Sequence, residues 1–146
     1  MSARKARHKT MQALVRGSRL FGVNPDLTHV DDELGELGRC NSLQPVRRQR
    51  FLQIMHATRA LDTTLAVVLT NAGVVPRHGI GKMLHQLPGL PRTTQGHLSQ
   101  SAMASFVTGI CSTRNRYAHK AGAFPTSQRE VDVVVSEIHA CIAAVL

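Results

Sequence analysis

The chain has 146 residues, 42% hydrophobic and 3% aromatic, a length that allows one core and excludes a second full domain beside it. Its three cysteines form no C-x-x-C pair, so neither a disulfide framework nor a structural zinc site is indicated. No run of about 18 apolar residues occurs, so a membrane span is not indicated either, and we expect a cytoplasmic protein. The formal net charge of +9 at pH 7 suits a polyanionic partner such as RNA, although basic proteins also use such charge for solubility alone.

The N-terminal part is expected to be a short arm followed by two helices. Residues 1–9 are predicted to form a flexible basic arm, because their Lys and Arg side chains repel one another and no apolar face is present. Residues 10–42 form a predicted N-terminal helical extension. Within it we expect one helix over about 10–21 and a short acidic helix over about 30–38.

We predict an all-α fold, an up-and-down bundle of four main helices with a short N-terminal extension, and place the bundle domain at residues 43–146. Apolar residues recur at helical spacing over about 45–72 and again over 98–117. The glycines and prolines between 73 and 96 predict a loop with one or two helical turns. Ser127-Gln-Arg-Glu130 is a capping box, so the last helix starts there.

One arginine departs from the apolar pattern of the third long helix. Its inward stripe is expected to consist of Met103, Phe106, Val107 and Ile110, and helical spacing continues it onto Arg114 and Tyr117. A buried arginine is costly unless it is paired or faces an opening. Two interpretations stay open at this point. Either Arg114 forms a salt bridge with a carboxylate from another helix (Asp62, Glu130 or Asp132), or it faces a cleft where an anion binds.

His119 follows Arg114 closely enough to share a site with it under one condition. Five positions turn a helix by about 140°, so the helix must end between them, or the site must be shared between subunits. Gly122 and Pro125 predict such an end. A fixed cation beside a titratable imidazole is a minimal set for phosphodiester chemistry. No Asp or Glu occurs from Thr63 through Arg129, so we expect no metal ion and no other cofactor.

The segment Arg114-Asn115-x-x-x-His119 resembles the R-x(4–6)-H motif of the HEPN family (higher eukaryotes and prokaryotes nucleotide-binding). As in that family, it ends the penultimate long helix and precedes a Pro-containing turn and one last amphipathic helix, so the resemblance covers about 43–146. It implies a metal-independent endoribonuclease that works as a homodimer, with two motifs facing each other. His119 would be the general base or acid, and Arg114 would stabilise the charged transition state. Asn115 would orient the histidine or bind phosphate.

The residues around the motif are expected to contact RNA. Arg116 and Lys120 are predicted backbone contacts, and Tyr117 either stacks on a base or completes the core stripe, the alternative that we favour. The resemblance places the protein in a toxin–antitoxin, antiviral defence or CRISPR-associated system, with an antitoxin or defence-complex protein as a further partner. The main alternative is a non-catalytic HEPN-like module for RNA binding, protein interaction or dimerisation. A third is a basic nucleic-acid-binding protein unrelated to the family.

Overall fold

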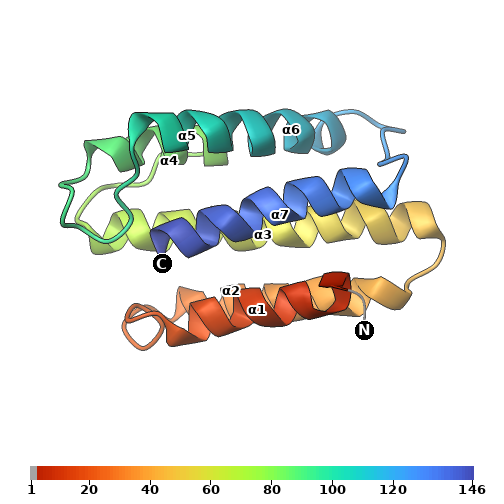
Figure 1. Ribbon diagram of the computed structural model, residues 1–146, viewed down its shortest axis with the longest axis horizontal. Coiled ribbons are helices and arrows are strands. Elements are labelled where there is room, and N and C mark those ends of the chain that lie inside the picture. Colours follow the sequence, from red (N-terminus) through yellow and green to blue (C-terminus); the bar gives the residue numbers. More distant parts are fainter. Residues whose placement is uncertain (1–2) are drawn as a thin grey trace.

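The long helix α3 (Val46–Asn71) is the centre of the fold, and α2, α4, α6 and α7 pack against it. The computed structural model describes residues 3–146, which are all-helical and contain no β-strand. In Figure 1, α3 and α7 lie between α1 and α2 on one side and α4, α5 and α6 on the other. Besides α3, the helices are α1 (Ala3–Gly17), α2 (Asp26–Arg39), a 3-10 turn (Cys40–Ser42), α4 (Ile80–Gln86), a 3-10 turn (Leu87–Gly89), α5 (Gln100–Phe106), a π turn (Val107–Cys111), α6 (Ser112–Ala118) and α7 (Gln128–Val145).

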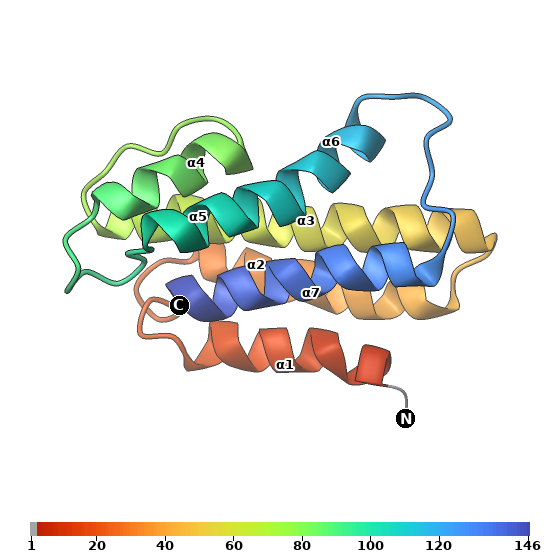
Figure 2. The same cartoon turned by 45° about the horizontal axis from the view of Figure 1, so that its top comes forward.

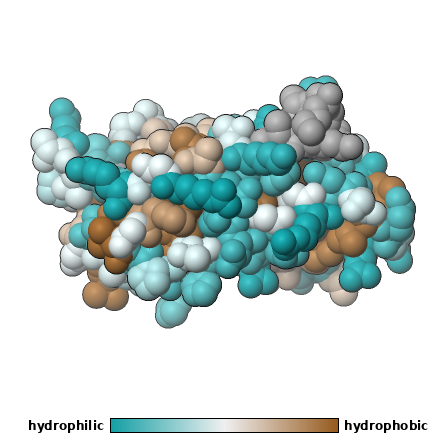
Figure 3. Space-filling model, turned by 90° about the horizontal axis from the view of Figure 1, so that it is seen from below, coloured by the Kyte–Doolittle hydropathy of each residue, from teal (hydrophilic) through white to brown (hydrophobic). Residues whose placement is uncertain are grey.

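The core is continuous from α1 to α7. Buried residues of α1, such as Met11 and Val15, belong to the same cluster as Ile138 and Ile142 of α7. The core therefore does not divide at residue 43, where the sequence analysis placed a boundary. Figure 3 shows the molecule from the side of α1 and α2. On this face hydrophilic residues cover most of the surface, and apolar residues lie in separate patches.

The expected flexible arm over 1–9 is wrong for residues 3–9, which form the first turns of α1. Residues 1 and 2 lie outside the described part of the chain. The reason for the difference is visible at Gly38 of α2, where an added Cβ would lie 2.5 Å from the ring of His8. Because glycine leaves this space open, His8 packs directly on α2, and this contact with a distant residue outweighs the repulsion between neighbouring cations.

The helix expected over 98–117 is found over 100–118, but its middle segment is π-helical. α5 and α6 are joined by the π turn Val107–Cys111, and in Figure 2 the ribbon of α6 rises away from α3. A π turn adds a residue to the turn and shifts the following helix by about 100° relative to an uninterrupted one. Ile110 and Tyr117 are still buried, but Arg114 between them is only partly buried.

The remaining elements agree closely with the sequence. The helical turns expected around 82–87 are found as α4, and α3 and α7 span the expected ranges. α2 begins before the expected short helix, and its start carries a hydrogen bond in which the Asp26 amide donates to Asn24 Oδ1 at 2.9 Å. Within the described chain, no helix is long and apolar enough to cross a membrane.

Candidate functional site

The motif segment from Arg114 to His119 lies at the end of the bundle where α6 ends and α3 and α7 begin (Figures 1 and 2). α6 ends at Ala118, and His119 is its C-cap residue, with φ −118° and ψ −3°. The expected helix end between the arginine and the histidine is therefore confirmed. His119 and the three residues after it are exposed, so the imidazole belongs to a loop on the surface.

The loop that carries His119 is held at its far end. Gly122 adopts a positive φ of 81°, a conformation that L side chains rarely adopt, and this residue turns the chain back toward α7. Pro125 is buried. The Arg50 side chain of α3 donates from Nη1 to the carbonyl of Thr126 at 3.2 Å. The loop is thus fixed to α3 just before α7 starts, and its exposed part lies between Ala118 and Phe124.

Arg114 is partly buried and is not neutralised. Its Nη1 donates to Asn115 Oδ1 at 3.0 Å, and within residues 3–146 no carboxylate forms an ion pair with it. Its positive charge acts on Cys111: burial raises the pKa of the Cys111 thiol, and Arg114 partly opposes that rise. Of the two interpretations of this arginine, the salt bridge is not found. The guanidinium keeps its charge at the protein surface.

Asn115 is exposed and contacts the arginine instead of the histidine that we expected it to orient. In the described chain no hydrogen bond joins His119 to Arg114 or to Asn115. One chain therefore brings Arg114 and Asn115 together and places His119 beyond the helix end.

Glu130 joins the end of α6 to the start of α7. Its Oε1 accepts from the Tyr117 hydroxyl and from Arg116 Nη1, the latter at 3.1 Å, and its Oε2 accepts from the Thr126 amide at 3.2 Å. The Ser127 hydroxyl accepts from the Glu130 amide at 3.2 Å, which confirms the predicted start of α7. The carboxylate does not close the capping box on Ser127, because its oxygens bind these other donors.

These contacts bear on the roles expected for Tyr117 and Arg116. Tyr117 is 5% exposed and part of the core, so the alternative that we favoured is confirmed, and a base cannot stack on its ring in this conformation. Arg116 is exposed but shares its charge with Glu130 and lies 5.9 Å from the Tyr117 ring centroid. Lys120 is exposed on the loop and has no such partner among the described residues.

A groove of about 330 Å³ opens beside His119. It is lined by Phe51 of α3 and by residues 117–124. The rings of Phe51 and Phe124 meet edge to face with centroids 5.7 Å apart, and the Arg47 guanidinium lies 5.2 Å from the centroid of Phe124. Neither phenylalanine was expected at the site from the sequence. A signal was present, since Phe124 is one of only five aromatic side chains (four Phe and one Tyr) and lies five positions after His119.

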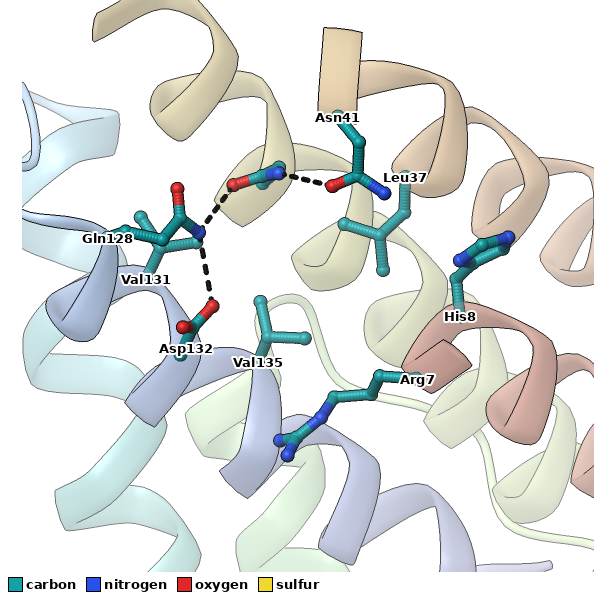
Figure 4. Close-up of a pocket in the computed structure, with 9 residues that line it drawn as sticks. Arg7, His8, Leu37, Asn41, Gln128, Val131, Asp132 and Val135 are labelled. Carbon is teal, nitrogen blue, oxygen red and sulfur yellow. Dashed lines mark hydrogen bonds between the residues drawn. The ribbon is translucent and has the colours of Figure 1, made fainter. Parts of the chain in front are cut away.

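A second cavity, of about 130 Å³, lies between α1, α2, α3 and α7 and contains no motif residue (Figure 4). A chain of amides crosses it: Gln128 Nε2 donates to Gln53 Oε1 at 3.0 Å and to Asp132 Oδ1 at 3.1 Å, and Gln53 Nε2 donates to Asn41 Oδ1 at 2.9 Å. This chain ties α7 to α3 and to the turn after α2. His8 lies at its edge, and burial lowers the pKa of its imidazole.

The described residues contain no group of three or more His, Cys, Asp or Glu side chains that could hold a metal ion. No family model, curated protein or solved structure matches the chain.

Proposed function

We propose that the chain is a metal-independent endoribonuclease with a HEPN-like bundle, in which Arg114 and His119 act on a phosphodiester bond of RNA. The observation that carries the proposal is a partly buried guanidinium that no carboxylate neutralises, placed one helix end away from an exposed histidine. An unneutralised guanidinium at a surface is suited to bind phosphate oxygens through two parallel hydrogen bonds. We expect this activity in the cytoplasm, as part of a toxin–antitoxin, defence or CRISPR-associated system.

The proposed reaction uses only groups of the protein and of RNA. An imidazole accepts the proton of a ribose 2′-hydroxyl, and the oxygen attacks the adjacent phosphorus. The bond from phosphorus to the 5′-oxygen breaks, and this oxygen receives a proton from a second acid. The products are a 2′,3′-cyclic phosphate and a 5′-hydroxyl. Arg114, held by Asn115, stabilises the charge that develops on the non-bridging oxygens.

A homodimer supplies the second acid in this proposal. Because no hydrogen bond joins Arg114 to His119 within the described chain, a single copy offers an unfinished arrangement. A two-fold axis beside α6 would place two motifs against one RNA strand, so that one His119 accepts a proton and the other donates one. Sedimentation of the purified chain at micromolar concentration tests this step, and a monomeric mass would contradict it.

A non-catalytic module is the second candidate. The observation that favours it is that none of the described side chains orients His119, whereas a general base usually has a partner that fixes its ring. In that case the cationic helix end would bind RNA, or a regulatory protein such as an antitoxin or a component of a defence complex, without cutting.

The deciding experiment compares His119→Ala with a matched control, His29→Ala, which removes an exposed histidine of α2. Single-stranded RNA is incubated with each protein in EDTA. We expect His119→Ala to lose about 100-fold or more of the cleavage rate, while RNA affinity stays within about twofold. His29→Ala should cut as the wild type does. Wild-type cleavage by His119→Ala, or a requirement for added Mg²⁺, would contradict the mechanism. Binding without any cleavage by the wild type would favour the module.

A further inference from the structure

We propose that the groove between Phe51 and Phe124 binds an unpaired base of the RNA strand next to the phosphate that His119 acts on. The proposal rests on the proposed function for the place of the phosphate. It assigns to Phe124 the base-stacking role that the buried ring of Tyr117 cannot perform.

The first argument is the exposure of an aromatic ring at a hollow. Phe124 is 37% exposed, and among the described residues it is the aromatic member of the exposed large hydrophobic side chains. Its neighbour Pro125 is buried, and Phe51 contacts it edge to face, so the ring is held in place and not left on a loose loop. The groove beside it has about 330 Å³, close to the roughly 300 Å³ at which small-ligand pockets begin.

The second argument is the composition of the wall. Besides the two phenylalanines and Tyr117, the groove is lined by Ala118, Ala121, Gly122 and Ala123, and also by His119 and Lys120. Most of this wall therefore offers apolar contacts to the flat face of a base, and its polar side chains are the two that the proposal assigns to the phosphate backbone. Stacking of this kind is tolerant of sequence. We therefore expect the groove to accept any base and to require that the base is unpaired, because a base inside a duplex cannot reach it.

The third argument is charge, and it selects a nucleic acid over an apolar peptide as the occupant. No carboxylate lines the groove, while Lys120 lies on its wall and Arg47 lies over Phe124. The nearest acidic residue in the sequence, Glu130, is already bonded to Arg116, Tyr117 and Thr126. A strand whose base enters the groove would thus have its phosphates next to cations, and a guanidinium next to a ring can also stack on a base.

A single tryptophan tests the proposal directly, because the chain contains none. Phe124→Trp is made together with His119→Ala, so that the RNA is bound and not cut. An unpaired oligonucleotide of about eight residues is titrated in, and we expect Trp emission to fall by about half, since a stacked base quenches the indole. A duplex of the same length should quench it far less.

The matched control is Val75→Trp in the same background. Val75 is 84% exposed in the connection after α3, and the helix from Phe51 to Asn71 places it about 30 Å from the groove. Its emission should change little with RNA. Equal quenching of both tryptophans would show contact with RNA over the whole surface and would overturn the groove. A further outcome would also overturn the proposal. If, without RNA, the emission of Phe124→Trp shifts to shorter wavelength as the protein concentration rises, a second copy of the chain covers the groove.

Kinetics separate a failure of this inference from a failure of the proposed function. Phe124→Leu keeps an apolar side chain without a flat ring, and we expect KM for single-stranded RNA to rise about tenfold while kcat stays within about twofold. If the wild type cuts RNA but Phe124→Leu has an unchanged KM and the tryptophan is not quenched, the groove is not a base site and the nuclease stands. If the tryptophan is quenched but no RNA is cut, the base site stands and the nuclease does not.

Discussion

Two regions of the protein differ in their balance of charge. In α2, acidic side chains outnumber basic ones, whereas at the junction of α6 with α7 basic side chains outnumber acidic ones. α2 holds five of the nine acidic residues of the chain. Glu36 pairs with Arg39 within the helix, while Asp31 and Glu33 pair with side chains of other helices. Arg16 of α1 binds Asp31 through two hydrogen bonds of 2.9 Å. Glu33 lies 2.8 Å from His56 and 3.2 Å from Arg59, both in α3. Asp31 and Glu33 therefore link α2 to its neighbouring helices α1 and α3.

At the junction, one carboxylate serves several donors. Glu130 accepts from Arg116 and Tyr117, while Arg114, Lys120 and Arg47 have no ion pair in the described part of the chain. The net charge of +9 is thus not spread evenly, because α2 holds five of the nine carboxylates, whereas at the motif end Glu130 pairs with Arg116 and the other three cations have no ion pair among the described residues. In this protein, the place of the unpaired cations is therefore more informative about function than the total charge.

The largest effect is expected from Arg114→Lys, which keeps the charge but removes the planar fork. We expect cleavage to fall about 100-fold, because an ammonium group cannot donate two parallel hydrogen bonds to phosphate oxygens. Arg16→Lys, in the paired region, is the matched control and should cut RNA normally. The measurement is the single-turnover rate on saturating RNA. If Arg114→Lys cut RNA at the wild-type rate, the unpaired arginine would have no special role in cleavage compared with the paired Arg16.

A smaller effect is expected from salt. With about four phosphate contacts, single-strand affinity should fall about 50-fold between 50 and 200 mM salt. Lys120→Ala should make the slope of log affinity against log salt less steep by about 0.7, the value of one contact. Arg116→Ala should do so less, because Glu130 already shares its charge. Arg92→Ala, an exposed cation before α5, should leave the slope unchanged. A slope that is the same for all four proteins would contradict a localised binding surface.

The smallest effect concerns stability, and it compares the two kinds of carboxylate contact. Tyr117→Phe removes a hydroxyl that donates to a charged oxygen in the core, so the free energy of unfolding should fall by about 1.5 kcal/mol. Arg16→Ala breaks a pair on an exposed guanidinium and should shift the urea midpoint less. Urea unfolding followed by circular dichroism measures both. If the free energy of unfolding fell more in Arg16→Ala than in Tyr117→Phe, the exposed ion pair would stabilise the fold more than the hydrogen bond of Tyr117, contrary to this prediction.

The sequence was sufficient wherever a local signal determines the structure. The apolar spacing in α3 and the cap at Ser127 predicted two long helices, and the end of α6 before His119 followed from the turn residues after it. These features depend on neighbours within a few positions, which the sequence shows directly. The surroundings of Arg114 did not follow in the same way, because the sequence left a salt bridge with a distant carboxylate and an open cleft as alternatives, and the structure shows no ion pair for it among the described residues.

The features that the sequence did not predict depend on distant partners. The ring of His8 finds room because Gly38 lies opposite in α2, and the groove exists because Phe51 of α3 meets Phe124 from the last loop. Asn115 bonds to its neighbour Arg114, although nothing in the spacing favours this contact over one to the histidine. Pairs so far apart in the chain, or choices between equally near partners, become visible only in the folded structure.

The π turn between α5 and α6 also bears on how this end of the protein tolerates changes in length. The turn holds one residue more than an α-helical turn would, so α5 and α6 are out of phase with each other. A chain with a single deletion within 107–111 could still form a continuous helix there, but that helix would rotate Arg114 and Asn115 by about 100° relative to α5. An insertion after Ala118 would only lengthen an exposed loop, at a cost of a fraction of a kcal/mol. The distance from arginine to histidine is therefore free to drift in related chains, whereas the length of the helix before the arginine is not.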